Sequence, residues 1–507
     1  MRPVNRYRTE HQVKTGRPLR LLAIDLGAES GRAILGTFDG SRLHLEVAHR
    51  FPNVPVRMGG TLYWDFVRLF GDVLHAIRAA QESGEVTSVG VDGWGVDFGL
   101  LDGRGRLMAN PVHYRDSRTE RMVELATQRV PRERIYADTG IQFIAINTLY
   151  QLLAMAEARD SQLERAWSML MIPDLVHYFL CDSTVGEYTN ATTTQCYDVS
   201  HAKWASSLLA DLNIPAHLFP DVVQPGTVLG PLRADVAQQV GARLSVIAPA
   251  THDTASAVVA TPLDGATAFL SSGTWSLIGL ELPSPVVTDA ARDGNLTNEG
   301  GVAGTIRLLK NVMGLWLVQE ARRGLDQALS YEQLTALAQD ATPFTAFIDP
   351  DDGRFLRPGD LQANVRAFCI ETGQPPPADA ATLVRVLLES LALKYAVIVA
   401  QLEAVSGRSI QAVHVVGGGS NNALLCQLTA DACERPVLAG PAEATAIGNL
   451  VVQAMALGEL ASVAEARALV ADSWPPMRYE PASDWAQARD RFHAMLDTRC
   501  QARGVLQ

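Results

Sequence analysis

Two short apolar runs separated by glycines form the first strong pattern in the chain. Residues 21–26 are Leu-Leu-Ala-Ile-Asp-Leu, and residues 33–38 are a second apolar run that ends at an Asp-Gly pair. Gly27 and Gly31 bound the segment between the two runs. Runs of this length on either side of a turn rich in small residues predict two strands joined as a β-hairpin.

The same pattern recurs in the second half of the chain. Residues 268–279 are an apolar run, a turn of small and hydroxyl residues, and another apolar run. Farther on, residues 414–416 predict a strand that ends in three glycines, and a helix is expected over residues 422–433. Two halves that each open on a hairpin predict a duplicated architecture with a cleft between them. The boundary is expected at residues 261–265.

Strand and helix patterns alternate through the rest of the first half. Residues 86–101 predict two strands joined through small residues, and residues 119–130 and 148–168 have the apolar spacing of helices. Pro173 is expected to open another helix, because proline is tolerated in a first helical turn. Strands mixed with helices indicate the α/β class.

Composition narrows the functional classes. The chain has 55 acidic residues against 43 Lys and Arg, and this net charge of −12 disfavours nucleic acids and anionic membranes as partners. No apolar run reaches the roughly 18 residues of a membrane helix. The six cysteines are scattered without a Cys-x-x-Cys pair, which predicts reduced thiols and a cytoplasmic location. Residues 1–19 are expected to form a flexible, solvated tail.

The turn of the first hairpin carries the residue types expected of a phosphate site. The chain has no P-loop motif and no dinucleotide fingerprint, and it has few lysines. Phosphate binding would therefore rest on backbone amides, hydroxyls, arginine and a metal ion. Glycines let the backbone approach an anion, Ser30 and Arg32 are donors, and Asp25 is placed to hold Mg²⁺ through water. A plain hairpin whose polar side chains bond their own turn is an equal alternative.

Asp253 is the candidate general base. It lies in a Thr-His-Asp-Thr segment between an apolar strand, 244–248, and a small-residue helix over 255–260. A helix N-terminus stabilises a carboxylate in its ionised form, as a base requires. The alternatives are that the Asp is only an N-cap and that His252 is only a packed neighbour.

Residues 92–98 form a candidate sugar-binding segment. They place a tryptophan and two carboxylates on a glycine-rich pair of strands. An apolar ring face beside hydrogen-bond acceptors is suited to a sugar. A tryptophan in the hydrophobic core is an equal alternative.

Taken in order, the motifs resemble one known family. They are DLGAESGR, VDGWGVDFGLLD, YRDSRT, TGIQFIAINTLYQL, EYTNATTTQ, THDTASAV, AFLSSGTWSLIG, NLTNEGG, LLKNVMGLWLVQE, VVGGGSNNALLCQLTADA and GPAEATAIGN. From about residue 21 to about residue 460 the set resembles the FGGY carbohydrate kinases. Within that family, TGIQF, EYTNATTTQ and SSGTWSL resemble the members that phosphorylate L-rhamnulose.

The resemblance implies a fold and a domain order. The fold is that of actin and the heat-shock chaperone ATPases, two duplicated α/β, ribonuclease H-like domains with an inter-domain cleft. An N-terminal sugar-kinase domain over residues 20–260 would carry the sugar and phosphate side. A C-terminal domain over residues 261–472 would carry the nucleotide side, and residues 473–507 would form a helical segment.

The resemblance also implies the roles of individual residues. Asp253 matches the proton acceptor. The positions that match sugar contacts are Gly95, His252, Asp253, Thr254 and Asn311. The positions that match ATP or phosphate contacts are Ala28, Glu29, Ser30, Gly31, Arg32, Thr274, Gln319 and Gly418.

Three positions depart from the family pattern. Glu29 stands where a small hydroxyl residue is usual, and its charge would repel phosphates unless it points away or onto a metal. Gly93 replaces a threonine, which would loosen the sugar pocket. Cys369 matches a cysteine that some members pair in a disulfide, but the partner position is Val386, so a free thiol is expected.

The reaction that the resemblance implies is transfer of the ATP γ-phosphoryl group to the 1-hydroxyl of L-rhamnulose, with Mg²⁺. The expected partners are a small sugar and ATP, with no nucleic acid and no membrane, and the oligomeric state stays open between monomer and dimer. A kinase for another ketose such as L-fuculose is the first alternative. A nucleotide-dependent sugar sensor or an actin-like assembly protein is the second, although neither needs a general base.

Overall fold

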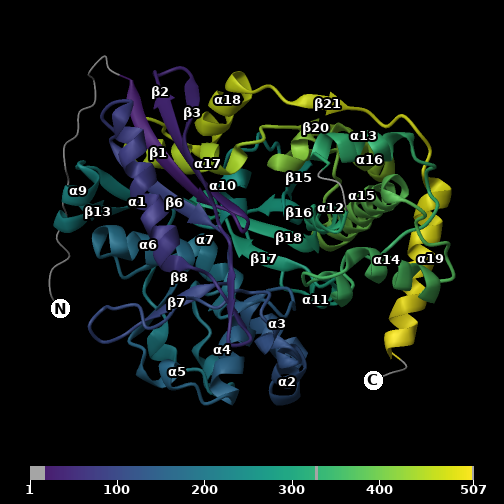
Figure 1. Cartoon of the computed structure of the whole chain (residues 1–507), viewed down its shortest axis with the longest axis horizontal. Coiled ribbons are helices and arrows are strands. Elements are labelled where there is room, and N and C mark those ends of the chain that lie inside the picture. Colours follow the sequence, from purple (N-terminus) through teal and green to yellow (C-terminus); the bar gives the residue numbers. More distant parts are fainter. Residues whose placement is uncertain (1–17, 326–328, 505–507) are drawn as a thin grey trace.

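The computed structural model describes residues 18–325 and 329–504 (Figure 1). The tail predicted for residues 1–19 therefore lies almost wholly outside the described residues, and strand β1 (Leu19–Leu26) begins where that tail was expected to end. Each half of the chain contributes one large mixed sheet to the described structure.

The sheet of the first half has six strands within the described residues, in the order β13-β14-β6-β1-β2-β3. β1 runs antiparallel to β2 and parallel to β6, so the predicted opening hairpin is confirmed. Its apolar residues are buried along the whole of β1, as expected for a strand inside a sheet that is covered on both faces. The other bounds are β2 (Ser30–Phe38), β3 (Leu43–Pro52), β6 (Ser88–Gly93), β13 (Thr227–Pro231) and β14 (Ser245–Ala248).

The sheet of the second half has seven strands in the described part of the chain, in the order β17-β18-β16-β15-β19-β20-β21. The hairpin predicted for residues 268–279 is confirmed as the antiparallel pair β15 and β16. The bounds are β15 (Thr267–Ser272), β16 (Trp275–Leu282), β17 (Thr297–Gly300), β18 (Ile306–Met313), β19 (Ala412–Val416), β20 (Val437–Ala439) and β21 (Met477–Tyr479).

The two sheets share a core topology. The order β3-β2-β1-β6-β14 in the first corresponds to β18-β16-β15-β19-β20 in the second. In each sheet the first three strands are antiparallel neighbours, and the next two are added in parallel. The duplicated α/β architecture predicted from the two hairpins is therefore confirmed.

Two helices, one from each half, pack against each other near the first sheet (Figure 1). They are α10 (Asp253–Val259) and α17 (Ala444–Ala456). Gly448 permits the contact, since a Cβ atom there would lie 1.8 Å from the carbonyl oxygen of Ser256. From α17, Gln453 donates to the carbonyl of Leu22 at 3.0 Å and accepts from the Ser88 hydroxyl at 2.7 Å. A helix of the second half is thus bonded to the central strands of the first sheet.

The strands predicted within residues 86–101 are present, but they do not pair with each other. β6 lies in the first large sheet, whereas β7 (Phe98–Leu101) pairs with β8 (Ser168–Met171) in a separate two-stranded sheet. The segment between them turns through Val96, a non-glycine residue with a φ of 67°. This turn directs the chain away from the first sheet.

The helical spacing of residues 148–168 corresponds to two helices with a break between them, and Ser168 already belongs to β8. α4 (Thr148–Glu157) ends before Arg159, which adopts a left-handed φ of 50°. α5 (Ser161–Arg165) then begins with Asp160 as its N-cap, whose carboxylate accepts the amide of Gln162. The helix predicted at Pro173 is confirmed as α6 (Ile172–Cys181), with Pro173 in its first turn.

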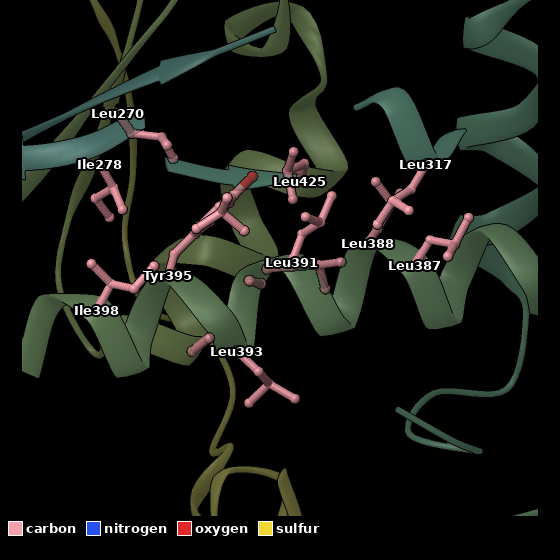
Figure 2. Packing of buried hydrophobic residues seen from close by; sticks show 14 of the residues in the cluster. Leu270, Ile278, Leu317, Leu387, Leu388, Leu391, Leu393, Tyr395, Ile398 and Leu425 are labelled. Carbon is pink, nitrogen blue, oxygen red and sulfur yellow. The ribbon is translucent and has the colours of Figure 1, made fainter. Parts of the chain in front are cut away.

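The core of the second half is built around α15 (Ala380–Ser406), a helix of 27 residues. Asp379 caps its start by accepting the amide of Thr382, and Gly407 ends it with a φ of 67°. Figure 2 shows leucines of α15 packed toward Leu317 of α12 and Leu425 of α16. Cys369 lies buried nearby as a free thiol, as predicted.

The remaining elements pack around the two sheets and around a separate apolar core beside β7 and β8. The other helices are α1 (Phe66–Glu82), α2 (Met122–Arg129), α3 (Arg132–Thr139), α7 (Tyr188–Ala191), α8 (Ser206–Asp211), α9 (Ala234–Val240), α11 (Asp289–Asp293), α12 (Trp316–Arg323), α13 (Tyr331–Asp340), α14 (Leu361–Glu371), α16 (Ala423–Cys433), α18 (Val463–Ser473) and α19 (Ala486–Gly504). The short strands are β4 (Val56–Met58), β5 (Thr61–Tyr63), β9 (Gly186–Glu187), β10 (Tyr197–Asp198), β11 (Lys203–Trp204) and β12 (Val222–Val223). Within the described ranges, no helix is long and apolar enough to cross a membrane.

Candidate active site

The turn between β1 and β2 is held by a buried ion pair. Arg32 lies opposite Asp25 in the hairpin register, and its Nε and Nη2 atoms are 2.9 and 2.7 Å from Asp25 Oδ2. The third nitrogen, Nη1, is 2.9 Å from Glu443 Oε2, just before α17. The charge of Asp25 is the main cause that raises the pKa of Arg32. The turn therefore carries a permanently charged guanidinium, paired with two carboxylates, where the two halves of the chain meet.

Glu29, the acidic residue of this turn, forms an ion pair with the second half of the chain. Its Oε1 atom contacts the guanidinium of Arg323 at the end of α12, 294 residues away in the sequence. Arg323 also contacts Glu320 one turn earlier. The Glu29 charge is therefore matched by a cation, which reduces its repulsion of a nearby phosphate. The sequence does not reveal Arg323 as a partner, because no local pattern links the two positions.

Gly31 is required here by packing within the first half. A Cβ atom at this position would lie 2.1 Å from the ring of Phe51 on the neighbouring strand β3. Gly27 is similarly close to the chain, since its Cβ would lie 2.7 Å from the Ser30 carbonyl oxygen. Both glycines thus have a structural role that exists without any bound anion.

Asp25 and Asp92 lie side by side at the ends of the parallel strands β1 and β6. Burial, together with the charge of Asp25, raises the pKa of Asp92 well above its usual range. Asn449 of α17 donates to Asp92 Oδ2 at 2.5 Å, and Oδ1 is buried without a hydrogen-bond partner in the described structure. The sequence identified Asp25 as a candidate for holding Mg²⁺, but it did not indicate that Asp92 lies beside Asp25.

Asp253 is the first residue of α10, and His252 takes the N-cap position. The hydroxyl of Thr254 donates to Asp253 Oδ1 at 3.1 Å, while the Asp253 side chain stays 33% exposed. Burial raises the pKa of Asp253; the neighbouring His252 opposes this effect, and the charge of Asp25 adds to it. The net direction is opposite to the stabilisation that a helix N-terminus alone predicts. A carboxyl with a raised pKa is a stronger proton acceptor once it is ionised.

The segment before Asp253 is fixed by a buried carboxylate. Glu187 Oε2 accepts the amide and the hydroxyl of Thr251 at 3.0 and 2.8 Å, and the amide of Gly93 donates to the Thr251 carbonyl at 2.9 Å. Glu187 opens the EYTNATTTQ motif, residues 187–195. Thr193 of that motif packs on Gly95, where a Cβ atom would lie 2.9 Å from the Thr193 hydroxyl. These contacts bring Gly95 and the Thr-His-Asp-Thr segment together.

Asn311 joins this group from β18 in the second half. Gln142 accepts the Asn311 amide at 2.9 Å and donates to its carbonyl at 3.2 Å. Glu299 lies 3.4 Å from His252 Nδ1 and 3.5 Å from Asn311 Nδ2, and so stands behind both residues. Sequence reasoning missed Glu299 and its partner Arg307, although two charged residues within buried strands were an available signal.

The residues assigned to the nucleotide lie around β15 and α12. Thr274 occupies the turn between β15 and β16, and its carbonyl accepts the amide of Trp316 at 3.1 Å. Gln319 follows on α12, and its Oε1 is buried without a partner in the described residues. Gly418 is exposed with open space at its Cβ position, whereas Gly419 beside it packs on Ser272 at the end of β15.

Trp94 belongs to an aromatic cluster, as the core alternative predicts. It is 6% exposed, and its ring centroid lies 4.3 Å from that of Trp64. Asp97 accepts both indole N–H groups, at 3.1 and 2.6 Å, and the Gln151 amide at 2.9 Å. Burial raises the pKa of Asp97 to about 6. This carboxylate therefore holds the cluster together from the interior.

Comparison with known proteins now identifies the class. The chain matches the FGGY family of carbohydrate kinases over both of its domains, the N-terminal domain at residues 20–260 and the C-terminal domain at residues 268–457. The chain belongs to this family.

Individual relatives are similar over nearly their whole length. A rhamnulokinase of Halalkalibacterium halodurans is 42% identical over 462 residues, which is 91% of this chain and 98% of that protein. A rhamnulokinase of Pectobacterium carotovorum is 43% identical over 493 residues, 96% of this chain and 98% of that protein. The structure of a xylulose kinase from Lactobacillus acidophilus superposes with a TM-score of 0.77 at 16% identity, covering 96% of this chain and 98% of the other. That likeness confirms the fold.

Proposed function

We propose that this chain transfers the γ-phosphoryl group of ATP to the 1-hydroxyl of L-rhamnulose. Two rhamnulokinases match it over nearly their full length, at 42% and 43% identity. In this proposal the residues that gather around Asp253 from both halves bind the sugar: Gly95, His252, Thr254 and Asn311. The residues that bind ATP and its phosphates are Ala28, Glu29, Ser30, Gly31, Arg32, Thr274, Gln319 and Gly418.

The observation that carries the proposal is the environment of Asp253. Its carboxyl is partly exposed, its pKa is raised by burial, and the Thr254 hydroxyl orients it. A general base needs these properties, whereas a protein that only binds a sugar does not. Asp253 accepts the proton of the sugar hydroxyl as that oxygen attacks the phosphorus, and ADP leaves with the electron pair of the broken bond.

Mg²⁺ fits the acidic side of this site. Within the described residues, no group of three or more His, Cys, Asp or Glu is arranged to ligate a metal directly. Asp25 and the unpartnered Oδ1 of Asp92 offer oxygens that suit a magnesium ion that keeps its waters. The charge of that ion would favour the ionised form of Asp92 against the burial that raises its pKa. When bound with ATP, Mg²⁺ supplies positive charge against the phosphates. Arg32 and the backbone of the turn supply the rest from the protein.

A single assay tests the substrate. ADP release would be followed with saturating Mg·ATP and four acceptors: L-rhamnulose, L-fuculose, D-xylulose and glycerol. Buried polar groups left unpaired by a wrong sugar cost about 1–3 kcal/mol each, so two misplaced hydroxyls lower kcat/KM by roughly 30- to 10⁴-fold. We expect L-rhamnulose to be best and L-fuculose to be next, because L-fuculose shares the methyl terminus and the reacting 1-hydroxyl. The loosening expected from Gly93 is not supported, since a Cβ atom there would lie 3.0 Å from Leu26 Cβ and 3.1 Å from the Leu26 carbonyl oxygen.

The outcomes separate the alternatives. Glycerol or D-xylulose equalling L-rhamnulose would remove the substrate assignment and leave a kinase of broader specificity. Sugar binding without any ADP release would favour a nucleotide-dependent sensor instead. We place the enzyme in the cytoplasm, since the cysteines whose side chains are described are free thiols.

A further inference from the structure

Two charged residues of the second half of the chain lie buried behind His252, which belongs to the first half. Glu299 on β17 and Arg307 on β18 are directly opposite in the antiparallel register, and they are 3% and 0% exposed. Arg307 Nη2 is 3.3 Å from Glu299 Oε2. The pair is therefore an ionised group kept inside the protein, which is costly unless it is fully paired.

The same nitrogen of Arg307 also contacts His252. Nη2 lies 3.2 Å from His252 Nδ1, closer than Glu299 Oε2, which is 3.4 Å from that ring atom. A guanidinium can only donate hydrogen bonds, so Nδ1 accepts here and the ring proton resides on Nε2. Glu299 Oε2 lies within ion-pair distance of the same Nη2 atom but accepts no hydrogen bond within the described residues. His252 Nε2 lies 3.5 Å from Asp253 Oδ1 and presents an N–H to the base.

The pair is anchored and reaches a second residue of the sugar site. Arg307 Nε donates to the Gly300 carbonyl at 2.8 Å, which fixes the guanidinium to the neighbouring strand. The other oxygen of Glu299, Oε1, lies 3.5 Å from Asn311 Nδ2. One buried carboxylate thus stands behind both His252 and Asn311, which come from different halves of the chain.

We propose that Glu299 and Arg307 are positioning residues for the phosphoryl transfer. Arg307 sets the tautomer of His252, and Glu299 holds Arg307 and the Asn311 amide in place. The His252 N–H then keeps the Asp253 carboxylate aimed at the sugar hydroxyl. This inference rests on the proposed function, because Asp253 is the base only if the chain is a sugar kinase.

Replacing both members of the pair separates positioning from structural support. Removing one partner would strand a buried charge, whereas removing both is often neutral for stability. We expect the double variant Glu299→Gln/Arg307→Met to keep an unfolding midpoint near that of the wild type. Its kcat should fall about 10²-fold, the size expected for a misplaced catalytic group, with KM for ATP within about twofold. The matched control is Arg385→Met/Glu389→Gln, which removes the Arg385–Glu389 ion pair of 2.6 Å within α15. Its kcat should not change.

The tautomer provides a test that does not depend on activity. Histidine-selective ¹⁵N labelling of the full chain, with the His252 signals assigned by their loss in His252→Gln, distinguishes the two ring nitrogens. We expect an unprotonated Nδ1 and a protonated Nε2 in the wild type, and a mixture of tautomers in the double variant.

Each outcome decides for or against the inference. A protonated Nδ1 in the wild type, or a double variant that retains kcat, would overturn it. If the double variant does not fold, the wild-type tautomer decides alone. A wild type that phosphorylates no ketose would defeat the proposed function, and the ¹⁵N measurement would still report on the role of Arg307.

Discussion

The two hairpin turns of this protein occupy equivalent places in the duplicated fold but differ in charge. The turn between β1 and β2 is flanked by Asp25 and Arg32 and carries Glu29. The turn between β15 and β16 runs Ser272-Gly273-Thr274 and has no ionisable side chain. The topology places both turns where the two halves meet, but their side chains differ in charge and so suit them to different roles. The first turn thus carries charged side chains, whereas the second offers only hydroxyl and backbone groups.

The largest effect on kcat is expected when the proposed general base is removed. Asp253→Asn should lower kcat by roughly 10²–10⁴-fold, the contribution of a positioned general base, and leave ADP affinity unchanged. Steady-state kinetics and calorimetric ADP titration measure the two effects. Asp289→Asn is the matched control, because Asp289 is also the first residue of a helix, α11, and its side chain is 88% exposed. Near wild-type kcat in Asp253→Asn would return Asp253 to a structural role.

On the neutral side, the Thr274 hydroxyl is expected to donate to a phosphate oxygen. A hydrogen bond to a charged group contributes about 1.5–3 kcal/mol, so Thr274→Val should lower kcat/KM for ATP by about 10- to 10²-fold. KM for the sugar should stay the same. An equal loss for sugar and ATP would show that the turn supports the whole site and not the nucleotide alone.

Removing the contact between Glu29 and Arg323 tests whether the Glu29 charge weakens ATP binding when it is not paired. An exposed pair contributes about 0.2–1 kcal/mol, so Arg323→Gln should raise KM for ATP by no more than about fivefold, because Glu29 is left unmatched beside the phosphates. The double variant Glu29→Gln/Arg323→Gln should return KM close to the wild-type value. An unchanged KM in Arg323→Gln would mean that Glu29 does not affect the phosphates.

The smallest effect is a displacement of the pH profile. Asp253 must be ionised to act, so activity is present above its pKa and is lost as the pH falls through it. Burial, aided by the Asp25 charge, raises that pKa, so the acid limb of kcat/KM should lie at higher pH than an ordinary aspartate of about 3.9 would give. Asp25→Asn should move the limb to lower pH. Adenosine binding, which does not require an ionised Asp253, should show no such limb.

The fold could be predicted from neighbouring residues because each half begins with a hairpin of two apolar runs around a turn of small residues. The hairpins, the strand before the glycine triplet and the helix at Pro173 all follow from neighbouring residues. The break within residues 148–168 could not be predicted, because the apolar spacing continues across it and the break is made by the backbone conformation at Arg159.

The site was less predictable because its contacts join distant positions. Glu29 and Arg323 are 294 residues apart, and Asp92 is bonded to Asn449 at a separation of 357. Gly31 illustrates the same limit, since the Phe51 ring that requires it lies on another strand. The family resemblance supplied the candidate residues, and only the structure shows which charges surround them.

The hydrogen bonds between α17 and the first sheet affect whether the two halves of this protein can be expressed separately. The amides of Asn449 and Gln453 bond to the carbonyls of Gly90 and Leu22, deep within the first sheet. A fragment that stops before the second hairpin would expose these carbonyls and the apolar surface that α17 covers. Two fragments cut between the halves should instead recover activity only when mixed, because one supplies a helix that the other needs. The protein is thus a natural candidate for a split-enzyme reporter, in which joining two fused partners restores catalysis.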